Sequence, residues 1–213
     1  MIDSYRHKGL RRKLAEEVRA KGIKDERIIS AINTIPRHYF LDSSFVEFAY
    51  QDKPFPIGAG QTISQPYTVA FQTELLSLKK NEKVMEIGTG SGYQVCVLME
   101  LGARVFSIER QHELYVKAKS LLPLMGYNPR LFYGDGYKGL PAFAPFDKIL
   151  ITAAAPEIPG ELLKQLKIGG FLVVPVGPGS TQIMMRITKV ADNQYKEEEF
   201  GFFRFVPLLG DKE

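Results

Sequence analysis

The sequence predicts an α/β fold with a doubly wound, mostly parallel sheet of seven strands. After about residue 66 the chain alternates short apolar runs, rich in Val, Ile, Leu and Phe, with helix-like segments. Apolar runs of this length are typical of parallel strands that helices cover on both faces. Two further runs near the C-terminus follow each other without an intervening helix, so they are expected to extend the sheet as an antiparallel pair.

The N-terminal part of the chain is expected to be helical. We expect residues 1–55 to form a helical extension that packs on a core of residues 56–213, within one structural domain. The second helix of the extension is expected to begin at Asp25, a good N-cap residue, and to end before Pro36.

The core is expected to begin with a loop and a helix. Residues 52–60 are dense in Pro and Gly, which predicts an extended loop, and a helix is expected from Pro66. The expected antiparallel pair covers residues 183–190 and 200–208. The five expected parallel strands are residues 83–88, 104–109, 130–134, 147–152 and 171–176.

Composition and charge argue against several classes of protein. An apolar content of 45% and a charged content of 24% are those of a soluble globular protein, and no apolar run is long enough to span a membrane. The N-terminus lacks the features of a signal peptide, so a cytoplasmic location is expected. The net charge of +4 lies within residues 1–27, in an amphipathic helix, and the remainder is neutral, so no nucleic-acid partner is expected.

A glycine-rich turn follows the first predicted strand of the core and opens a helix. Its glycines are Gly88, Gly90 and Gly92, and Glu86 stands two places before the first of them. The next strand ends in Glu109. Glycines allow the backbone to approach a ligand closely, and a carboxylate at the end of the next strand can accept hydrogen bonds from ribose hydroxyls. The pattern indicates a nucleotide-like cofactor, with an ordinary tight turn as the alternative interpretation.

The glycine spacing argues against a dinucleotide. The fingerprint G-x-G-x-x-G has its third glycine where this chain has Tyr93, and a pyrophosphate needs bare helix N–H groups at close range. The E-x-G-x-G-x-G arrangement instead resembles the first motif of class I S-adenosylmethionine-dependent methyltransferases, which have a Rossmann-like fold. Their cofactor has no phosphate.

Polar and small residues follow the other predicted strands. In an open parallel sheet the ligand lies beyond the carboxyl ends of the strands. Asp135, which stands between Gly134 and Gly136, could bind the adenine amino group there. Residues 152–155 are small and leave room for a substrate beside the sulfonium.

Longer segments carry a more specific resemblance. The chain resembles the protein-L-isoaspartate O-methyltransferases over roughly residues 30–209, in order and with natural spacing. The segment at residues 61–64 is more discriminating than the glycine turn, which many methyltransferases share. The matching segments are residues 56–67, 86–93, 107–110, 134–136, 144–147, 152–156, 169–177 and 205–208.

The resemblance implies a repair reaction on isoaspartyl peptides and damaged proteins. The family transfers a methyl group from S-adenosylmethionine to the free carboxyl of L-isoaspartyl or D-aspartyl residues, and the ester then recloses to a succinimide. A carboxyl with a pKa of about 4 is already ionised at neutral pH, so no general base is needed. The protein mainly supplies proximity and orientation. His7, His38 and His112 show no triad or metal spacing, and no metal is expected.

The resemblance also implies site residues. Ser64 would be the active-site residue that donates a hydrogen bond to the substrate carboxylate, with an N-cap of the helix from Pro66 as its alternative role. Tyr67 stands where some members carry a histidine, and Leu209 where some carry a threonine near the cofactor. The expected cofactor-binding residues are Gln61, Thr62, Ile63, Glu86, Gly88, Thr89, Gly90, Ser91, Gly92, Glu109, Arg110, Asp135 and Gly136.

Two other functions stay open from the residues alone. One is a class I methyltransferase that acts on RNA or a small molecule; it is less favoured because the body of the chain is neutral and no Asn/Asp-Pro-Pro-aromatic loop follows the fourth strand. The other is an adaptor that binds S-adenosylmethionine without turnover. A monomer is expected, and the basic first helix is expected to help bound the peptide cleft.

Overall fold

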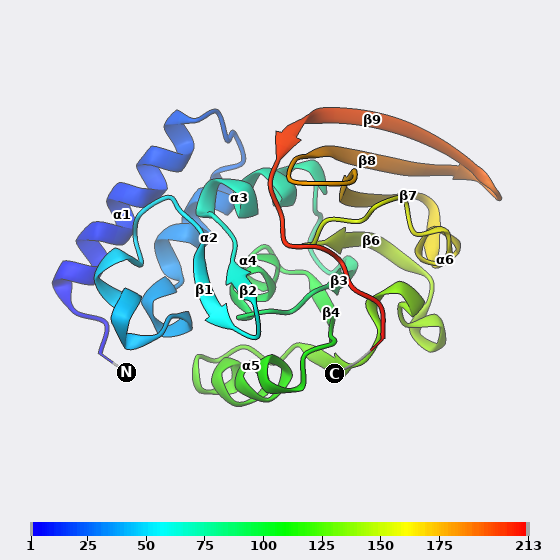
Figure 1. Ribbon diagram of the computed structural model, residues 1–213. Helices are drawn as coiled ribbons and strands as arrows, with labels where there is room; N and C mark the ends of the chain where they lie inside the picture. Colours follow the sequence, from blue (N-terminus) through cyan, green and yellow to red (C-terminus); the bar gives the residue numbers. More distant parts are fainter. Residues whose placement is uncertain (1, 212–213) are drawn as a thin grey trace.

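A seven-stranded sheet forms the centre of the molecule, as the sequence predicts (Figure 1). The computed structural model describes residues 2–211. The strands of this sheet are β3 (Lys83–Ile87), β4 (Arg104–Glu109), β5 (Arg130–Tyr133), β6 (Phe146–Ile151), β7 (Leu166–Val176), β8 (Gln182–Ala191) and β9 (Gln194–Phe203). Their order is β5-β4-β3-β6-β7-β8-β9. The first five strands in this order pair in parallel, and β8 pairs antiparallel with both β7 and β9.

Both faces of the sheet are covered, which explains why its inner strands are mostly apolar. Neighbouring residues of a strand point to opposite faces. Val84 and Leu150 lie in one apolar cluster, Met85 and Ile149 lie in the other, and all four side chains are fully buried. The helices are α1 (Tyr5–Ala20), α2 (Glu26–Thr34), α3 (Pro66–Leu75), α4 (Tyr93–Glu100), α5 (His112–Leu124) and α6 (Gly160–Lys164), with short 3-10 helices η1 (Arg37–Phe40), η2 (Ser43–Phe48), η3 (Gly136–Lys138) and η4 (Pro141–Phe143).

The N-terminal helices share the core of one face of the sheet. α1 and α2 pack against each other, and α2 also packs against α3 and α4. Asp25 caps α2, because its side chain accepts a hydrogen bond from the N–H of Arg27. The helix ends at Thr34, two residues before Pro36. Both ends of this helix agree with the prediction.

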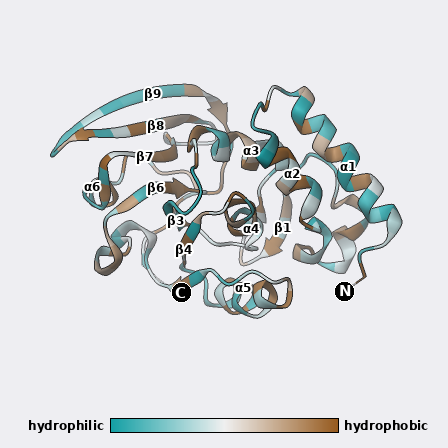
Figure 2. Ribbon diagram, turned by 180° about the vertical axis from the view of Figure 1, so that it is seen from behind, coloured by the Kyte–Doolittle hydropathy of each residue, from teal (hydrophilic) through white to brown (hydrophobic). Residues whose placement is uncertain are grey.

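The C-terminal strand differs from the prediction. β9 covers residues 194–203 rather than 200–208. It is the edge strand and is largely hydrophilic (Figure 2), so its residues lack the apolar run that marks a buried strand. The apolar run that follows it crosses the carboxyl ends of the central strands instead. There Ala154 donates to the carbonyl of Val206 and accepts from the N–H of Leu208, each at 2.7 Å.

For two other elements, the predicted bounds or type differ from those in the structure. β7 begins at Leu166, ahead of the predicted residue 171, because its pairing with β6 shifts register and takes in Gly169 and Gly170. The expected loop at residues 52–60 contains a short strand, β1 (Phe55–Gly58), which pairs antiparallel with β2 (Gln61–Ile63). The Pro and Gly residues that predict a loop are also tolerated in so short a ribbon.

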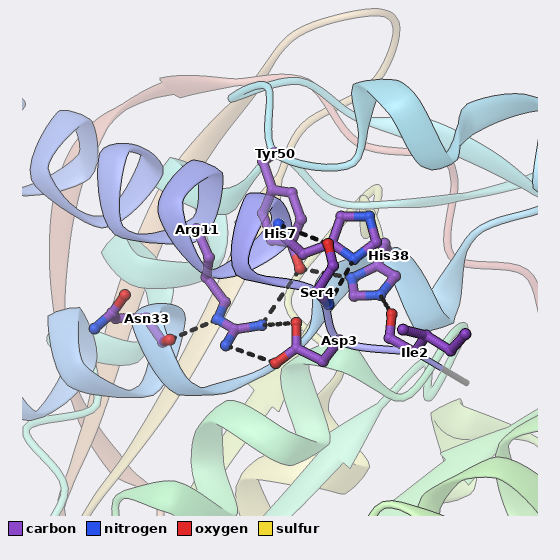
Figure 3. A network of polar contacts seen from close by, with 8 residues as sticks. All are labelled: Ile2, Asp3, Ser4, His7, Arg11, Asn33, His38 and Tyr50. Carbon is purple, nitrogen blue, oxygen red and sulfur yellow. Dashed lines mark hydrogen bonds and ion pairs between the residues drawn. The ribbon is translucent and has the colours of Figure 1, made fainter.

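A polar network that the sequence spacing does not predict ties the start of the chain to the fold (Figure 3). Arg11 donates to both carboxylate oxygens of Asp3, at 3.1 Å each, and to the hydroxyl of Tyr50 at 3.4 Å. The Tyr50 hydroxyl lies 2.6 Å from Nδ1 of His38. The rings of His7 and His38 lie with their centroids 3.9 Å apart. Distant parts of the sequence meet here because α1 packs back over the segment that follows α2.

The network favours a structural role over a metal site. Ligand atoms of Asp3, His7 and His38 lie within 4.8 Å of one another, which is close enough to hold an ion. However, Asp3 is paired with Arg11, and both ring nitrogens of His38 have hydrogen-bond partners in Tyr50 and the carbonyl of Ile2. Burial lowers the pKa of His38, and the neighbouring His7 and Arg11 lower it further. The folded state therefore favours the neutral form of His38.

Acidification is expected to weaken the fold through His38. Its pKa in the folded state lies below the ordinary value of 6.5, so in the window below about pH 6.5 the unfolded chain binds more protons than the folded one. The contribution of His38 to the free energy of unfolding should therefore fall as the pH falls through this window. Urea denaturation of the parent and of His38→Gln at pH 7.5 and pH 5.5 isolates this contribution, because the parent should lose stability relative to the variant on acidification. An equal change in the variant would contradict this assignment.

Candidate active site

A cavity lies at the carboxyl ends of the central strands, where an open parallel sheet binds its ligands. Its wall brings together the segment at residues 61–64, the glycine turn, the end of β4 and the C-terminal crossing segment. Most of the predicted site residues line it. These are Gln61, Thr62, Ile63, Ser64, Gly88, Thr89, Gly90, Ser91, Glu109, Arg110 and Gly136.

The glycine turn is shaped by close contacts that a side chain would block. Gly88 has φ of +94°, and a Cβ atom there would lie 2.7 Å from Oγ1 of Thr152. The Thr152 hydroxyl lies within hydrogen-bond distance of the carbonyl oxygens of Ile87 and Gly88, at 3.0 and 2.8 Å. Only glycine fits both the backbone angle and this contact.

Glu109 is held by two backbone amides and faces the cavity. Its side chain accepts from the N–H of Gly90 through Oε2 and from the N–H of Gln111 through Oε1, at 2.8 Å each. The residue is 4% exposed. A carboxylate oxygen can accept more than one hydrogen bond, so Glu109 can also receive ribose hydroxyls. Glu109 thus lines the cavity at the end of β4, and its contact with ribose stays a prediction.

Glu86 lies behind the cavity wall rather than in it. Its side chain is fully buried, accepts a hydrogen bond from the hydroxyl of Ser107 at 2.6 Å, and leaves Oε1 without a partner among the described residues. The Ser107 hydroxyl lies 2.6 Å from that of Thr89, which does line the cavity. Burial raises the pKa of Glu86 to about 8. A protonated Glu86 therefore supports the wall through Ser107 and Thr89.

Two other predicted residues also lie outside the cavity lining. Gly92 is the N-cap of α4, with φ of +87°, and packs against Leu122. Asp135 caps η3 by accepting from the N–H of Tyr137 at 2.9 Å, and its carboxylate lies 3.7 Å from Nζ of Lys138. Its neighbour Gly136 forms the wall at this strand end.

Ser64 lies where the cavity meets a second, larger groove, and it lines both. The alternative role as an N-cap is wrong: the N-cap of α3 is Gln65. The N-terminus of α3 is instead bound by Asp52, which accepts from the N–H of Tyr67 at 2.8 Å and from the side chain of Gln65 at 2.9 Å. Within residues 2–211 the Ser64 hydroxyl makes no hydrogen bond that would compete with a ligand.

The sequence did not predict several residues of the site. Gln94 lines the cavity, and no sequence signal marks it. Thr152 also lines it; this residue ends a predicted strand and is one of the small residues expected beside the sulfonium. Leu209 also lines the cavity, through a side chain that cannot donate a hydrogen bond. Tyr67 lines the groove rather than the cavity, and Lys21, at the end of α1, lines it too.

Comparisons with known proteins decide the family. The model of the family "Protein-L-isoaspartate(D-aspartate) O-methyltransferase (PCMT)" matches residues 9–213. The chain belongs to this family. Relatives named protein-L-isoaspartate O-methyltransferase include those of Christiangramia forsetii, 61% identical, and Flavobacterium psychrophilum, 60% identical, each over the full length of both chains.

Solved structures of the same family have the same fold. One protein-L-isoaspartate O-methyltransferase superposes with a TM-score of 0.85 at 30% identity and covers 94% of this chain and 66% of that one. A Plasmodium falciparum structure, described as a putative family member in complex with S-adenosyl-L-homocysteine, has a TM-score of 0.80 at 24% identity and covers 93% of this chain and 98% of that one. The doubly wound, mostly parallel fold is confirmed.

Family membership confirms the enzyme class and the cofactor expected from the sequence. The chain is a methyltransferase that uses S-adenosylmethionine and acts on isoaspartyl-containing proteins. The alternatives of an RNA or small-molecule methyltransferase and of a non-catalytic adaptor have no comparable support. Among the described helices, none has the length and apolar character required to cross a membrane.

Proposed function

We propose that Ser64 orients the substrate carboxylate at the junction of the cavity and the groove, with S-adenosylmethionine held in the cavity. One observation carries this proposal: Thr62, Ser64, Thr152 and Val206 line both spaces. A methyl donor on one side and a peptide on the other would meet at these residues. The groove has the open form that a chain segment needs.

The chemistry of the cavity fits this cofactor. Glu109 offers a carboxylate to ribose hydroxyls, and the apolar side chains of Ile87, Ile108 and Leu208 offer a surface to a base. Oε1 of Gln94 is buried and has no hydrogen-bond partner among the described residues, so a donor group of a ligand would satisfy it. When bound, S-adenosylmethionine supplies a methyl group carried on a positively charged sulfur.

The roles of the remaining cofactor-binding residues follow from their places in the fold. Gln61, Thr62, Ile63, Ser91 and Arg110 would form the rim of the cavity. Gly92 and Asp135 would act through the turns that they form, since neither lines the cavity, and Glu86 would act through Ser107 and Thr89.

Ser64 acts as a donor toward an acceptor that is already charged. The substrate carboxylate is ionised at neutral pH, so no group of the protein needs to remove a proton. A hydrogen bond from the hydroxyl to one carboxylate oxygen fixes its direction and leaves the other oxygen to react. Orientation of this kind lowers the entropic part of the barrier.

The same proposal includes a monomeric enzyme in the cytoplasm, with flexible segments of damaged proteins as substrates and no nucleic-acid or membrane partner. Two basic residues of the first helix are paired within the fold, which supports the exclusion of nucleic acid. Arg11 pairs with Asp3, and Arg19 pairs with Glu26. Charges that are neutralised within the fold contribute little to phosphate binding.

Ser64→Ala is expected to reduce turnover of an isoaspartyl peptide by about 10- to 100-fold, because a hydrogen bond to a charged group contributes about 1.5–3 kcal/mol. The affinity for S-adenosylmethionine and the free energy of unfolding should stay close to those of the parent protein. Transfer of labelled methyl groups to an isoaspartyl peptide, with the aspartyl peptide as a control substrate, measures the rate.

A matched variant is Ser120→Ala, which removes an exposed hydroxyl from α5, outside the cavity and the groove. Its rate should equal that of the parent. An undiminished rate in Ser64→Ala would refute the role of the hydroxyl. Labelling of RNA but not of the isoaspartyl peptide would refute the whole assignment.

A further inference from the structure

The groove beyond Ser64 is built largely by the end of β9 and the segment that leaves it. Figure 1 shows β9 along the outer edge of the sheet, with the chain then turning across the carboxyl ends of the central strands. Residues 200–206 line the groove on this side, and Tyr67 and Phe71 of α3 line it on the other. The groove is therefore continuous with the reaction site and is rich in aromatic side chains.

A β-bulge at the end of β9 sets the direction of these side chains. Ile183 pairs with Phe202 and Met185 with Glu199, so two steps along β8 span three along β9. Within the extra step lies Gly201, whose φ is +84°. Bulges of this kind turn a strand and re-aim its side chains, often beside active sites.

The bulge leaves a large apolar side chain in solvent at the groove. Phe202 is 75% exposed although it lies in a strand and lines the groove. Its neighbour Phe203 packs on Phe71, with ring centroids 5.0 Å apart. Phe202 is thus an apolar surface that a bound segment could cover.

The charge of the groove is positive. Lys21 and Arg204 are the charged residues in its described lining, and no carboxylate accompanies them there. Lys21 is already paired with Glu17 and Asp52. Arg204 is exposed and makes no ion pair or hydrogen bond with any residue of the described part of the chain. Its charge is available to a ligand.

We infer that Phe202 and Arg204 determine which isoaspartyl segments this enzyme prefers, and that the groove favours segments with an acidic side chain beside an apolar one. The inference rests on the proposed position of the substrate carboxylate at Ser64. From there the segment would continue along the groove, over Phe202 and past the guanidinium of Arg204. Carboxylates complement the unpaired cation, and an apolar side chain would remove Phe202 from water.

Seven-residue peptides with a central isoaspartate test the charge preference. One set carries Glu, Gln or Lys within two residues of the isoaspartate, on either side, in an otherwise Ala-rich peptide. On at least one side we expect KM for the Glu peptide to be about fivefold lower than for the Gln peptide, with Lys the weakest, as for a partly exposed ion pair. The preference should shrink in 0.5 M salt, because mobile ions screen exposed charges.

Matched variants assign the effect to the two residues. Arg204→Gln should abolish the difference between Glu and Gln peptides, whereas Arg12→Gln, which removes an exposed positive charge of α1 outside the groove, should retain it. Phe202→Ala should raise KM about tenfold for peptides with a neighbouring Leu and little for peptides with Ala. Ile168→Ala removes another exposed apolar side chain, 62% exposed and outside the groove, and should change neither value.

The outcomes separate this inference from the proposed function. A parent enzyme without preference between Glu and Gln peptides on either side, or an Arg204→Gln variant that retains the preference, would overturn the inference. In both cases the Ala-rich isoaspartyl peptide would still be methylated. If the parent enzyme did not methylate that peptide, the proposed function would be overturned instead.

Discussion

Glu109→Ala is expected to weaken the binding of S-adenosylmethionine by about 100-fold or more. The substitution removes the carboxylate that would receive the ribose hydroxyls, and a hydrogen bond to a charged group contributes about 1.5–3 kcal/mol. It also leaves the N–H groups of Gly90 and Gln111 without the acceptor that each has at 2.8 Å. Each 1.4 kcal/mol corresponds to a tenfold change in affinity, so loss of the ribose contact and of the order in the glycine turn together gives the expected factor.

Isothermal titration calorimetry with S-adenosylmethionine and with its demethylated product measures this change. Glu109→Gln should be intermediate, because the amide keeps one acceptor oxygen but turns its NH₂ group toward a backbone donor. Glu113→Ala is the matched control, since this carboxylate is exposed on α5 and pairs with Lys117. Undiminished affinity in Glu109→Ala would show that the cofactor is bound elsewhere.

Glu86→Gln is expected to make the protein more stable at pH 8 by about 3 kcal/mol and to leave its stability at pH 5 nearly unchanged. Burial raises the pKa of Glu86 from 4.5 to about 8. Between these values Glu86 binds more protons in the folded protein than in the unfolded chain, so its contribution to the free energy of unfolding should fall as the pH rises. The amide imitates the protonated carboxyl in shape and charge, and it does not titrate.

Urea denaturation of the parent and the variant at pH 5 and pH 8 gives the four free energies that this prediction needs. The fall in stability between the two pH values should be smaller in Glu86→Gln than in the parent, and Glu113→Gln, at an exposed position, should behave as the parent does. Equal falls in Glu86→Gln and in the parent would mean that Glu86 is charged in the folded state.

The parts of the fold that the sequence predicts well are those in which local chemistry and the final environment agree. Apart from their first residues, Lys83 and Arg104, β3 and β4 are buried on both faces. Their other positions are apolar or carry the buried polar residues Glu86, Ser107 and Glu109, and their bounds follow from this run. β9 faces solvent at the edge of the sheet, and because it contains Lys and Glu residues it lacks the apolar pattern by which a strand is predicted. The apolar residues 205–208 mark a buried crossing segment instead of a strand of the sheet.

In the site, too, features set by the local sequence are predicted, and features set by long-range packing are not. The glycine turn and Glu109 are close in sequence to the strands that position them, and the general rule for parallel sheets places them together. The start of α3 is bound by Asp52 and not by Ser64, and Asp52 belongs to another segment that no local pattern connects with α3. The meeting of His7 with His38 and the bulge at Gly201 likewise depend on long-range packing, and sequence spacing contains no signal for either.

Asp52 has a wider consequence. Its side chain is 2% exposed and binds the start of α3 on one side and Lys21, the C-cap of α1, on the other. One carboxylate thus braces the outermost helix against the segment that carries Ser64. If Ser64 orients the substrate as proposed, substitutions on α1 that break the contact between Lys21 and Asp52 should also lower the rate of methyl transfer.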